Sequence, residues 1–257
     1  MIEQPIMVKI CDVVVESPGV KTFFLPLKMP FEPGQFVMVW IPCLDEKPFT
    51  IAYIREDVMG ISVLKRGPFT TALHEKKVGD WIGVRGPYGK GFRLQEDLLS
   101  CVMGGGIGMA SVATVAGRLR RAVVLQGART SHELLYRGRF PDMKLSTDDG
   151  SVGLRGTAVD LLNEQLERQR FQKVYACGPE RMLHRVVELC GKQGVECEVS
   201  LERYVKCGFG VCGQCDCSGQ RVCLDGPVFT AEELSAMDDF GKRTITKTGE
   251  RIAGLAH

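Results

Sequence analysis

The sequence has no long apolar run, no strong excess of charge of either sign, and no internal repeat or low-complexity tract. No stretch approaches the roughly 18 consecutive apolar residues of a membrane-spanning helix, so we expect no membrane segment. The formal net charge is only +2, with 25% charged residues, and neither a basic stripe nor an acidic tail is present. We therefore expect the protein to bind neither membranes nor nucleic acids.

The sequence also has few histidines and no pattern typical of a secretory leader at its first residues. The first residues do not combine a basic region with an apolar one, as a secretory leader does. The four histidines show no spacing that suggests metal binding or acid–base catalysis. We expect a cytoplasmic protein in a reducing compartment, where free thiolates persist. Its 257 residues exceed one typical domain, and an apolar fraction of 44% can support real cores.

Cysteine, by contrast, is abundant, and five of the eleven cysteines fall within residues 207–223. Four of them, Cys207, Cys212, Cys215 and Cys223, have the spacing C-x4-C-x2-C-x7-C, and the first three match the plant-type 2Fe–2S pattern. The glycines between them suit a loop whose N–H groups approach the sulfurs. The sequence therefore predicts a 2Fe–2S cluster on these four thiolates.

Two other uses of these cysteines remain open at this point. A structural zinc site more often has two C-x2-C pairs, and only one is present. Disulfides are disfavoured because nothing marks the chain as secreted and the other six cysteines are scattered among apolar residues. Cys217 is surplus to the four-ligand set, and we interpret it as a packed neighbour of the loop.

Residues 1–95 contain short segments rich in Val, Ile and Phe, separated by Pro and Gly turns. The six expected strands cover residues 8–15, 22–27, 35–41, 50–55, 60–65 and 81–85. Their number and spacing predict a closed antiparallel barrel. A helix is expected over residues 69–75, and its N-terminus with the hydroxyls of Thr70 and Thr71 is a natural phosphate site.

Residues 96–198 alternate apolar strands with helical patterns, which predicts a doubly wound parallel α/β domain. Strands are expected at 98–103, 122–126 and 173–177, and helices at 109–120, 158–168 and 180–192. Residues 199–257 are the third predicted unit, a small cysteine-rich domain. Its one expected helix begins with a capping box, Thr230-Ala231-Glu232-Glu233.

A glycine turn, Gly104-Gly105-Gly106-Ile107-Gly108, joins the first expected strand of the α/β domain to its first helix. In a parallel sheet this position favours a pyrophosphate, because backbone N–H groups and the helix dipole meet there. The turn departs from the dinucleotide-binding fingerprint, since Met109 occupies the third glycine position and no acidic residue ends the second strand. A tight turn without a ligand therefore remains an alternative.

Several motifs along the chain resemble those of a known family. The ferredoxin reductase superfamily has motifs similar to Lys47-Pro48-Phe49-Thr50, Arg85-Gly86-Pro87-Tyr88-Gly89, Gly104-Gly105-Gly106-Ile107-Gly108 and Cys177-Gly178-Pro179. Two C-terminal motifs closely resemble one branch of this superfamily, the electron-transfer subunits of NAD-dependent dihydroorotate dehydrogenases. These motifs are Glu202-Arg203-Tyr204-Val205-Lys206-Cys207-Gly208 and Val222-Cys223-Leu224-Asp225-Gly226-Pro227-Val228-Phe229. The resemblance covers nearly the whole chain, and its C-terminal part is the more specific. It implies an oxidoreductase subunit with FAD, a 2Fe–2S cluster and NAD.

The resemblance implies that FAD binds to the barrel. It assigns the flavin ring and phosphates to Lys47, Pro48, Phe49 and Thr50, and the adenosine diphosphate part to Leu64, Lys65, Gly67, Phe69 and Thr70. Lys47 stands where the family usually has arginine, which keeps the charge but loses bidentate phosphate pairing. Ordinary core packing is the alternative for Phe49 and Phe69.

NAD is implied at the α/β domain. The pyrophosphate is assigned to Gly104, Gly105, Gly106 and Gly108, and the nicotinamide to Cys177, Gly178 and Pro179. No side chain is expected to act as an acid, base or nucleophile, because the cofactors carry the chemistry. We interpret Cys177 as a buried neutral thiol that gives position rather than catalysis. The residues leave NADP open, because Arg120, Arg121 and Arg129 are candidates for a 2′-phosphate contact.

The implied activity is electron transfer from the FMN of a dihydroorotate dehydrogenase catalytic subunit, through the cluster and FAD, to NAD+ in pyrimidine biosynthesis. The chain has no substrate barrel of its own, so dihydroorotate oxidation is assigned to that partner, in a heterotetramer. One alternative is the flavin and iron–sulfur subunit of a sulfide dehydrogenase or ferredoxin-linked transhydrogenase. A non-enzyme alternative is a redox-sensing or zinc-bound interaction module.

Overall fold

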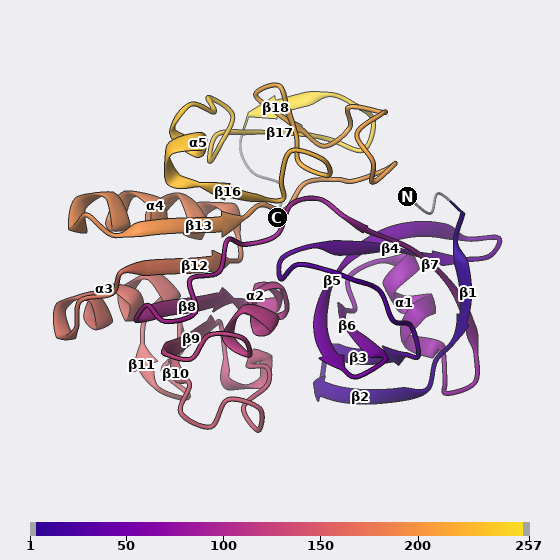
Figure 1. The fold of residues 1–257 in the computed structure, drawn as a ribbon, viewed down its shortest axis with the longest axis horizontal. Coiled ribbons are helices and arrows are strands. Elements are labelled where there is room, and N and C mark those ends of the chain that lie inside the picture. Colours follow the sequence, from indigo (N-terminus) through magenta and orange to yellow (C-terminus); the bar gives the residue numbers. More distant parts are fainter. Residues whose placement is uncertain (1–3, 254–257) are drawn as a thin grey trace.

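A computed structural model describes residues 4–253, which form an antiparallel barrel, a central parallel sheet with helices, and a C-terminal loop-rich region (Figure 1). Residues 1–3 and 254–257, at the outer ends of the first and third predicted units, lie outside the described residues. Most of the N-terminal segment in which we expect no leader therefore lies outside them too. The three domain boundaries remain predictions.

The N-terminal strands form one seven-stranded sheet in the order β1-β7-β4-β5-β6-β3-β2. The strands are β1 (Ile6–Lys9), β2 (Asp12–Ser17), β3 (Val20–Leu25), β4 (Phe36–Ile41), β5 (Asp45–Arg55), β6 (Val58–Leu64) and β7 (Trp81–Tyr88), and α1 (Pro68–Glu75) follows β6. The end strands β1 and β2 are consecutive in the chain, so the sheet curls into the expected barrel.

The predicted number of six strands is wrong in one place, because the expected strand at residues 8–15 divides into β1 and β2. Between them the backbone changes partners: the Ile10 N–H donates to the Asp80 carbonyl (2.9 Å) and the Cys11 N–H to the Phe24 carbonyl (2.9 Å). One apolar run thus supplies both edge strands of the sheet, β1 and β2.

The second sheet has the order β11-β10-β9-β8-β12-β13-β16 and is parallel except for the antiparallel edge strand β16. Its strands are β8 (Ser100–Gly105), β9 (Ala122–Ala128), β10 (Lys144–Thr147), β11 (Leu154–Arg155), β12 (Lys173–Cys177), β13 (Glu196–Ser200) and β16 (Val228–Thr230). The helices α2 (Met109–Ala116), α3 (Ala158–Arg168) and α4 (Glu180–Gln193) accompany it, with short 3-10 turns η1 (Gly106–Gly108) and η2 (Ser131–Glu133). Strands β10, β11, β13 and β16 were not among the expected ones.

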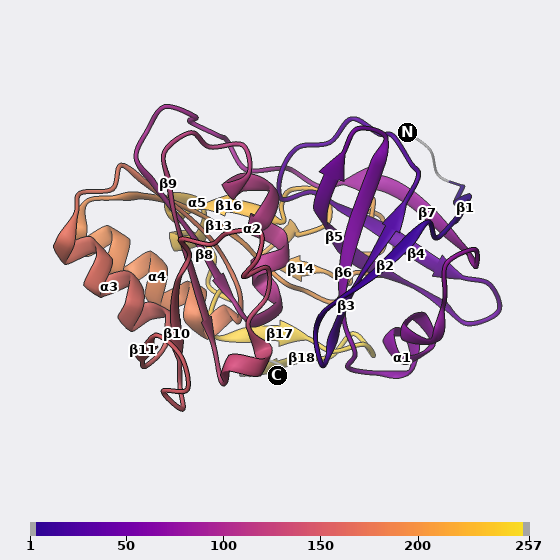
Figure 2. The ribbon, with the colours of Figure 1, turned by 90° about the horizontal axis from the view of Figure 1, so that it is seen from below.

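Helices cover both faces of this sheet, as a doubly wound fold requires. Alternate residues of β8 point to opposite sides: Cys101 and Met103 join the core with α3 and α4, and Val102 joins the core with α2. Helix α2 lies between the sheet and the barrel (Figure 2), so the barrel and the sheet meet across it.

The C-terminal region completes the molecule with β14 (Asp216–Cys217), β15 (Gln220–Arg221), α5 (Ala231–Ser235), β17 (Arg243–Ile245) and β18 (Arg251–Ala253). The expected capping box is present at α5, where the Glu233 N–H donates to the Thr230 hydroxyl and the Thr230 N–H to the Glu233 carboxylate. Within residues 4–253, no helix is long and apolar enough to cross a membrane.

Candidate functional site

Residues 207–223, here called the cluster loop, bring the four predicted ligand cysteines together. Cys215 and Cys223 are buried, Cys207 is half-buried and Cys212 is exposed. Cys207 lies beside Cys212, and Cys215 lies beside Cys223. The cluster loop therefore has one side in the core and one side at the surface.

Backbone N–H groups in the cluster loop point at the sulfurs. The Gly210 N–H donates to Cys223 Sγ (3.2 Å), and the Cys223 N–H donates to Cys215 Sγ (3.4 Å). Gly210 has φ +84°, a left-handed conformation that glycine adopts without strain and that turns this N–H inward. Such donors favour the thiolate over the thiol, which is the form that binds metal.

The pKa values of two of the cysteines reflect this arrangement. Burial opposes ionisation of Cys207, but N–H groups of residues 209, 211 and 212 outweigh it and lower its pKa to about 6. A hydrogen bond from Cys223 lowers the pKa of Cys215 to about 7. Both therefore ionise more readily than an ordinary cysteine.

The donor set fits a two-iron cluster. A 2Fe–2S cluster takes four thiolates, and the cluster loop has four cysteines at the predicted positions, two of which accept backbone N–H groups at their sulfurs. Within residues 4–253, no three or more His, Cys, Asp or Glu side chains are arranged so that they could hold a metal ion, so the case for a cluster rests on the cysteine spacing and the inward N–H donors. When a cluster is bound, Cys207, Cys212, Cys215 and Cys223 would hold it, and the inward N–H groups would tune its potential.

Arg85 of β7 attaches the cluster loop to the barrel. Its Nη2 donates to the Cys207 carbonyl (2.7 Å), its Nη1 to the Tyr88 hydroxyl (2.9 Å) and its Nε to the Glu46 carboxylate (2.7 Å). The guanidinium also lies 5.5 Å from the centre of the Phe209 ring. Burial alone would lower the pKa of Arg85, but the bonds to Glu46 and Tyr88 raise it, so the side chain remains a cation.

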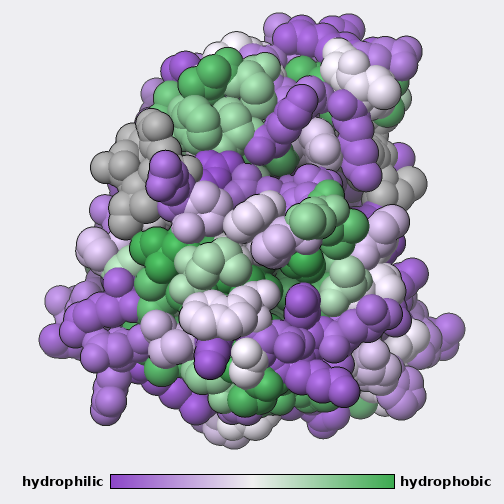
Figure 3. All heavy atoms as spheres, turned by 90° about the vertical axis from the view of Figure 1, so that its right-hand side faces the viewer, coloured by the Kyte–Doolittle hydropathy of each residue, from purple (hydrophilic) through white to green (hydrophobic). Residues whose placement is uncertain are grey.

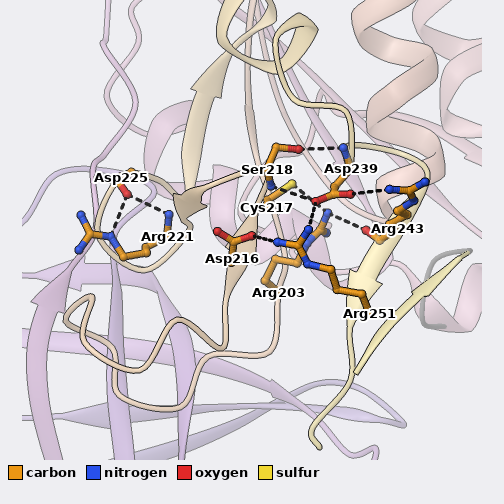
Figure 4. Close-up of polar contacts among 9 residues, drawn as sticks. All are labelled: Arg203, Asp216, Cys217, Ser218, Arg221, Asp225, Asp239, Arg243 and Arg251. Carbon is orange, nitrogen blue, oxygen red and sulfur yellow. Dashed lines mark hydrogen bonds and ion pairs between the residues drawn. The ribbon is translucent and has the colours of Figure 1, made fainter. Parts of the chain in front are cut away.

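Arg203 attaches the C-terminal region to the α/β sheet from the other side, and Figure 4 shows its place beside Cys217. Its guanidinium pairs with Glu180, the first residue of α4, and donates through Nη2 to Cys217 Sγ (3.3 Å). The Gly241 N–H donates to the same Glu180 carboxylate (2.7 Å). Cys217 is fully buried against Arg203, as expected for a packed neighbour of the loop.

A second set of contacts in Figure 4 fixes the β17–β18 hairpin on the cluster loop. Asp239 accepts from the Ser218 N–H (3.1 Å) and its own N–H donates to the Ser218 hydroxyl (2.9 Å). Arg251 donates to Asp216 (2.9 Å). Polar contacts thus add to the apolar packing of the C-terminal region, whose buried residues, such as Leu234 and Phe240, join the same core as α3 and α4.

The residues predicted to bind FAD lie on β5, on β6 and at the start of α1. Thr70 is engaged by the backbone, because its hydroxyl accepts from the N–H groups of Arg66 (2.8 Å) and Gly67 (3.0 Å). The rings of Phe49 and Phe69 stack with centroids 6.1 Å apart, which brings β5 against α1.

The other predicted FAD residues have contacts of their own. Lys47 contacts Asp45, and its Nζ lies 5.6 Å from the centre of the Tyr204 ring. Leu64 ends β6, Lys65 is exposed, and Pro48 faces Met38 of β4.

One hydroxyl joins the predicted flavin residues to the predicted nicotinamide residues. Thr50 Oγ1 and Ser111 Oγ, in the first turn of α2, are 2.9 Å apart. Burial raises the pKa of Cys177 to about 11, against hydrogen bonds with Ser111 and Ser200. Cys177 is therefore a neutral thiol, and Ser111 lies between it and Thr50.

The predicted NAD residues form two turns in contact. A Cβ on Gly108 would lie 2.4 Å from the Cys177 carbonyl oxygen, and one on Gly178 would lie 3.1 Å from Gly105 Cα. A Cβ on Gly106, by contrast, would meet nothing within 4 Å. The glycines at 104, 105 and 108 thus permit close packing beside Pro179 before α4, and Gly106 leaves open space in the turn before α2.

From the sequence we assign no role to the residues that join the units, although three of them stand in the motifs that resemble the family: Glu46, Arg85, Ser111, Glu180, Arg203 and Tyr204. Arg85 ends the apolar run of β7 yet is only 6% exposed, and a cation in such a run signals a buried partner. Nothing in the sequence indicates which partner it takes.

Comparison with known proteins adds independent information. A family model described as the iron–sulfur cluster binding domain of dihydroorotate dehydrogenase B matches residues 202–235. A curated protein from Methanocaldococcus jannaschii, named as a probable electron transfer subunit of dihydroorotate dehydrogenase B (NAD(+)), is 40% identical over 97% of this chain and 99% of its own length. A protein of the same name from Thermococcus kodakarensis is 43% identical over 84% of this chain and 91% of its own.

Among solved structures, an NADH-dependent reduced ferredoxin-NADP oxidoreductase described for flavin-based electron bifurcation superposes with a TM-score of 0.81 and 28% identity, over 90% of this chain and 89% of that one. Phthalate dioxygenase reductase shares the fold at a TM-score of 0.60 and 20% identity, over 73% of this chain and 64% of that one. Given the extent of the match to the curated relatives, this chain belongs to the family of electron transfer subunits of NAD(+)-dependent dihydroorotate dehydrogenase B.

Proposed function

We propose that this chain carries electrons from the FMN of a catalytic subunit, which oxidises dihydroorotate to orotate in pyrimidine biosynthesis, through its own 2Fe–2S cluster and FAD to NAD+. The observation that carries the proposal is the cluster loop itself: four cysteines with inward N–H donors, bonded through Cys207 to a barrel of ferredoxin reductase type. The match of residues 202–235 to the cluster domain of this enzyme class supports it.

The cofactors explain why one chain combines these parts. FAD, when bound, exchanges electrons singly or in pairs, whereas a 2Fe–2S cluster carries one and NAD carries two as a hydride. The residues of this chain position the cofactors and shield them from solvent. Arg85 keeps the cluster loop on the barrel, and Ser111 and Gly108 keep the glycine turn against Cys177.

The FAD and NAD contacts assigned by resemblance are part of the proposal. Support for the FAD residues comes from their placement on β5, β6 and α1, where Phe49 and Phe69 bring the segments together. Support for the NAD residues comes from the open space at Gly106 beside the Cys177 turn. We further propose a heterotetramer with the catalytic subunit and a cytoplasmic location.

A second candidate has one observation in its favour. The NADH-dependent reduced ferredoxin-NADP oxidoreductase structure superposes over nine-tenths of this chain, which keeps a ferredoxin-linked role open. Identity is lower with that protein, 28%, than with the dihydroorotate dehydrogenase relatives, about 40%. Reduced ferredoxin and dihydroorotate, each supplied as electron donor with the matching partner, separate the two roles.

The test is dihydroorotate-dependent reduction of NAD+ by the chain combined with an FMN-containing catalytic subunit. Cys215→Ser removes a buried ligand, so we expect the cluster absorption and this combined activity to be lost. FAD content and NADH oxidation by an artificial dye should remain, because the barrel is intact. Cys11→Ser, at an exposed cysteine outside the cluster loop, is the control and should keep both activities. Oxidation of dihydroorotate by this chain alone would contradict the proposal.

A further inference from the structure

The outward face of the barrel beside the cluster loop is apolar and uncovered within residues 4–253. Strands alternate their side chains, and the inward residues Val8, Val39 and Ile82 are in the barrel core. The outward residues Met7 of β1 and Trp40 of β4 both lie opposite Gly83 of β7. Because Gly83 has no side chain, Trp40 and Pro5 pack over it: a Cβ there would lie 2.7 Å from Trp40 Cε3 and 3.0 Å from Pro5 Cβ.

This surface begins where the cluster loop ends. Met38, the outward residue before Trp40 on β4, is covered by the cluster loop, since a Cβ on Gly208 would lie 3.0 Å from Met38 Cγ. Beyond it lies a hollow of about 590 Å³, lined by Pro5, Trp40, Cys43, Leu44, Asp45, Glu46 and Arg85. Arg85 therefore lines the hollow on one side and bonds the Cys207 carbonyl on the other.

The composition of this surface is that of a protein interface. The chain has only two tryptophans, and both are here. Trp81 is 50% exposed, Leu44 49% and Met7 39%, and apolar surface is plain on the barrel half of this side of the molecule (Figure 3). Tryptophan and methionine are enriched at interfaces, and exposed apolar patches of this kind mark binding sites. We call Met7, Trp40, Leu44 and Trp81 the tryptophan face.

We propose that the tryptophan face docks the FMN-bearing catalytic subunit, which places its flavin beside the cluster loop. The inference rests on the proposed function, because a donor to the cluster must sit next to it, and the tryptophan face is continuous with the loop through Arg85. Arg85 is paired with Glu46, so its charge is balanced within this surface, and the Lys9 ammonium lies 5.2 Å from the centre of the Trp81 ring. The exposed apolar side chains around these groups suit a permanent protein partner better than a small charged ligand.

Two variants, Met7→Glu and Trp81→Glu, test the proposal by placing a charge in the contact. Neither residue belongs to the predicted cofactor sites, so absorption spectra and NADH oxidation by a dye should be unchanged. Affinity for the purified catalytic subunit, measured by calorimetry, should fall about 30-fold or more, the size of a hot-spot loss. Val15→Glu is the matched control, because Val15 is 65% exposed on β2, an edge strand of the other half of the barrel.

The outcomes separate this proposal from the function on which it rests. If the unaltered chain supports no dihydroorotate-dependent NAD+ reduction, the proposed function fails and the docking surface falls with it. If it does, but Met7→Glu and Trp81→Glu bind as tightly as Val15→Glu, the docking proposal alone is overturned. Sedimentation of the chain without its partner gives the last test: a dimer that Trp81→Glu dissociates would make the tryptophan face a contact between two copies and overturn the proposal.

Discussion

Two buried arginines hold the cluster loop and its surroundings, one from each side, and each has its own glutamate. Arg85 pairs with Glu46 on the barrel, and Arg203 pairs with Glu180 at the start of α4. Each also donates to a cysteine of the cluster loop: Arg85 to the Cys207 carbonyl and Arg203 to Cys217 Sγ. The molecule thus uses the same chemical device at both of its internal junctions.

The two pairs differ in depth and in what surrounds the guanidinium. The side chains of Arg85 and Glu46 are 6% and 19% exposed, whereas those of Arg203 and Glu180 are 3% and 8% exposed. All three nitrogens of Arg85 have partners, but within residues 4–253 Nε of Arg203 is buried with none. At the contact with the barrel, the Arg85 guanidinium is therefore hydrogen-bonded through all three of its nitrogens. At the contact with the α/β sheet, the Arg203–Glu180 ion pair is more deeply buried but less completely hydrogen-bonded.

Breaking the deeper pair should have the largest effect on stability. Arg203→Met leaves the Glu180 carboxylate buried with only the Gly241 N–H as a described donor. Removing one partner of a buried ion pair costs about 3–5 kcal/mol. We expect the free energy of unfolding of the holoprotein, measured by chemical denaturation, to fall by this amount.

The control is the double variant Arg203→Met with Glu180→Leu, which removes both charges. Replacing a whole buried pair by apolar residues is often nearly neutral, so most of the lost stability should return. An Arg203→Met variant as stable as the unaltered protein would show that the α/β junction does not depend on this pair.

Breaking the pair at the barrel should cost less but change the cluster more. In Arg85→Met, Glu46 keeps access to water, so we expect a loss of about 1–3 kcal/mol, the cost of leaving polar groups unpaired. The Cys207 carbonyl also loses its donor from the barrel, so the electron paramagnetic resonance spectrum of the reduced cluster should change. FAD content and NADH oxidation by a dye should stay the same.

Arg85→Lys sharpens the result, because lysine keeps the charge but has no planar fork to reach Glu46 and the Cys207 carbonyl together. We expect it to restore stability more than it restores the cluster spectrum. A spectrum identical to that of the unaltered protein in both variants would mean that Arg85 does not position the cluster loop.

The same comparison shows what the sequence can predict. The four predicted ligand cysteines lie within 17 residues, so their spacing alone indicates a cluster. The bond from Arg85 to Cys207 joins residues 122 positions apart, and no local pattern encodes it. The helices α3 and α4 carry clear apolar stripes, and they begin where the sequence predicts.

The missed strands have specific causes. Strand β13 contains Glu196 and Glu198, which read as solvent-exposed positions, yet Glu198 is buried because its carboxylate pairs with Lys173 (2.9 Å) and accepts from the Arg93 N–H. Strands β10 and β11 are four and two residues long, too short for a periodic signal. Tertiary pairing, rather than local propensity, defines these edges of the sheet.

The smallest expected effect on stability comes from removing the sulfur of Cys217, which bonds Arg203 of the deeper pair and stands among the predicted cluster ligands in the sequence. Cys217→Ala removes the sulfur that accepts from Arg203, but the guanidinium keeps Glu180 and the Glu202 carbonyl (3.0 Å), so no charge is left unpaired. We expect a loss of about 1 kcal/mol in the free energy of unfolding, with iron content and the cluster spectrum unchanged. Loss of iron would make Cys217 a ligand, and the set Cys207, Cys212, Cys215 and Cys223 would then be wrong.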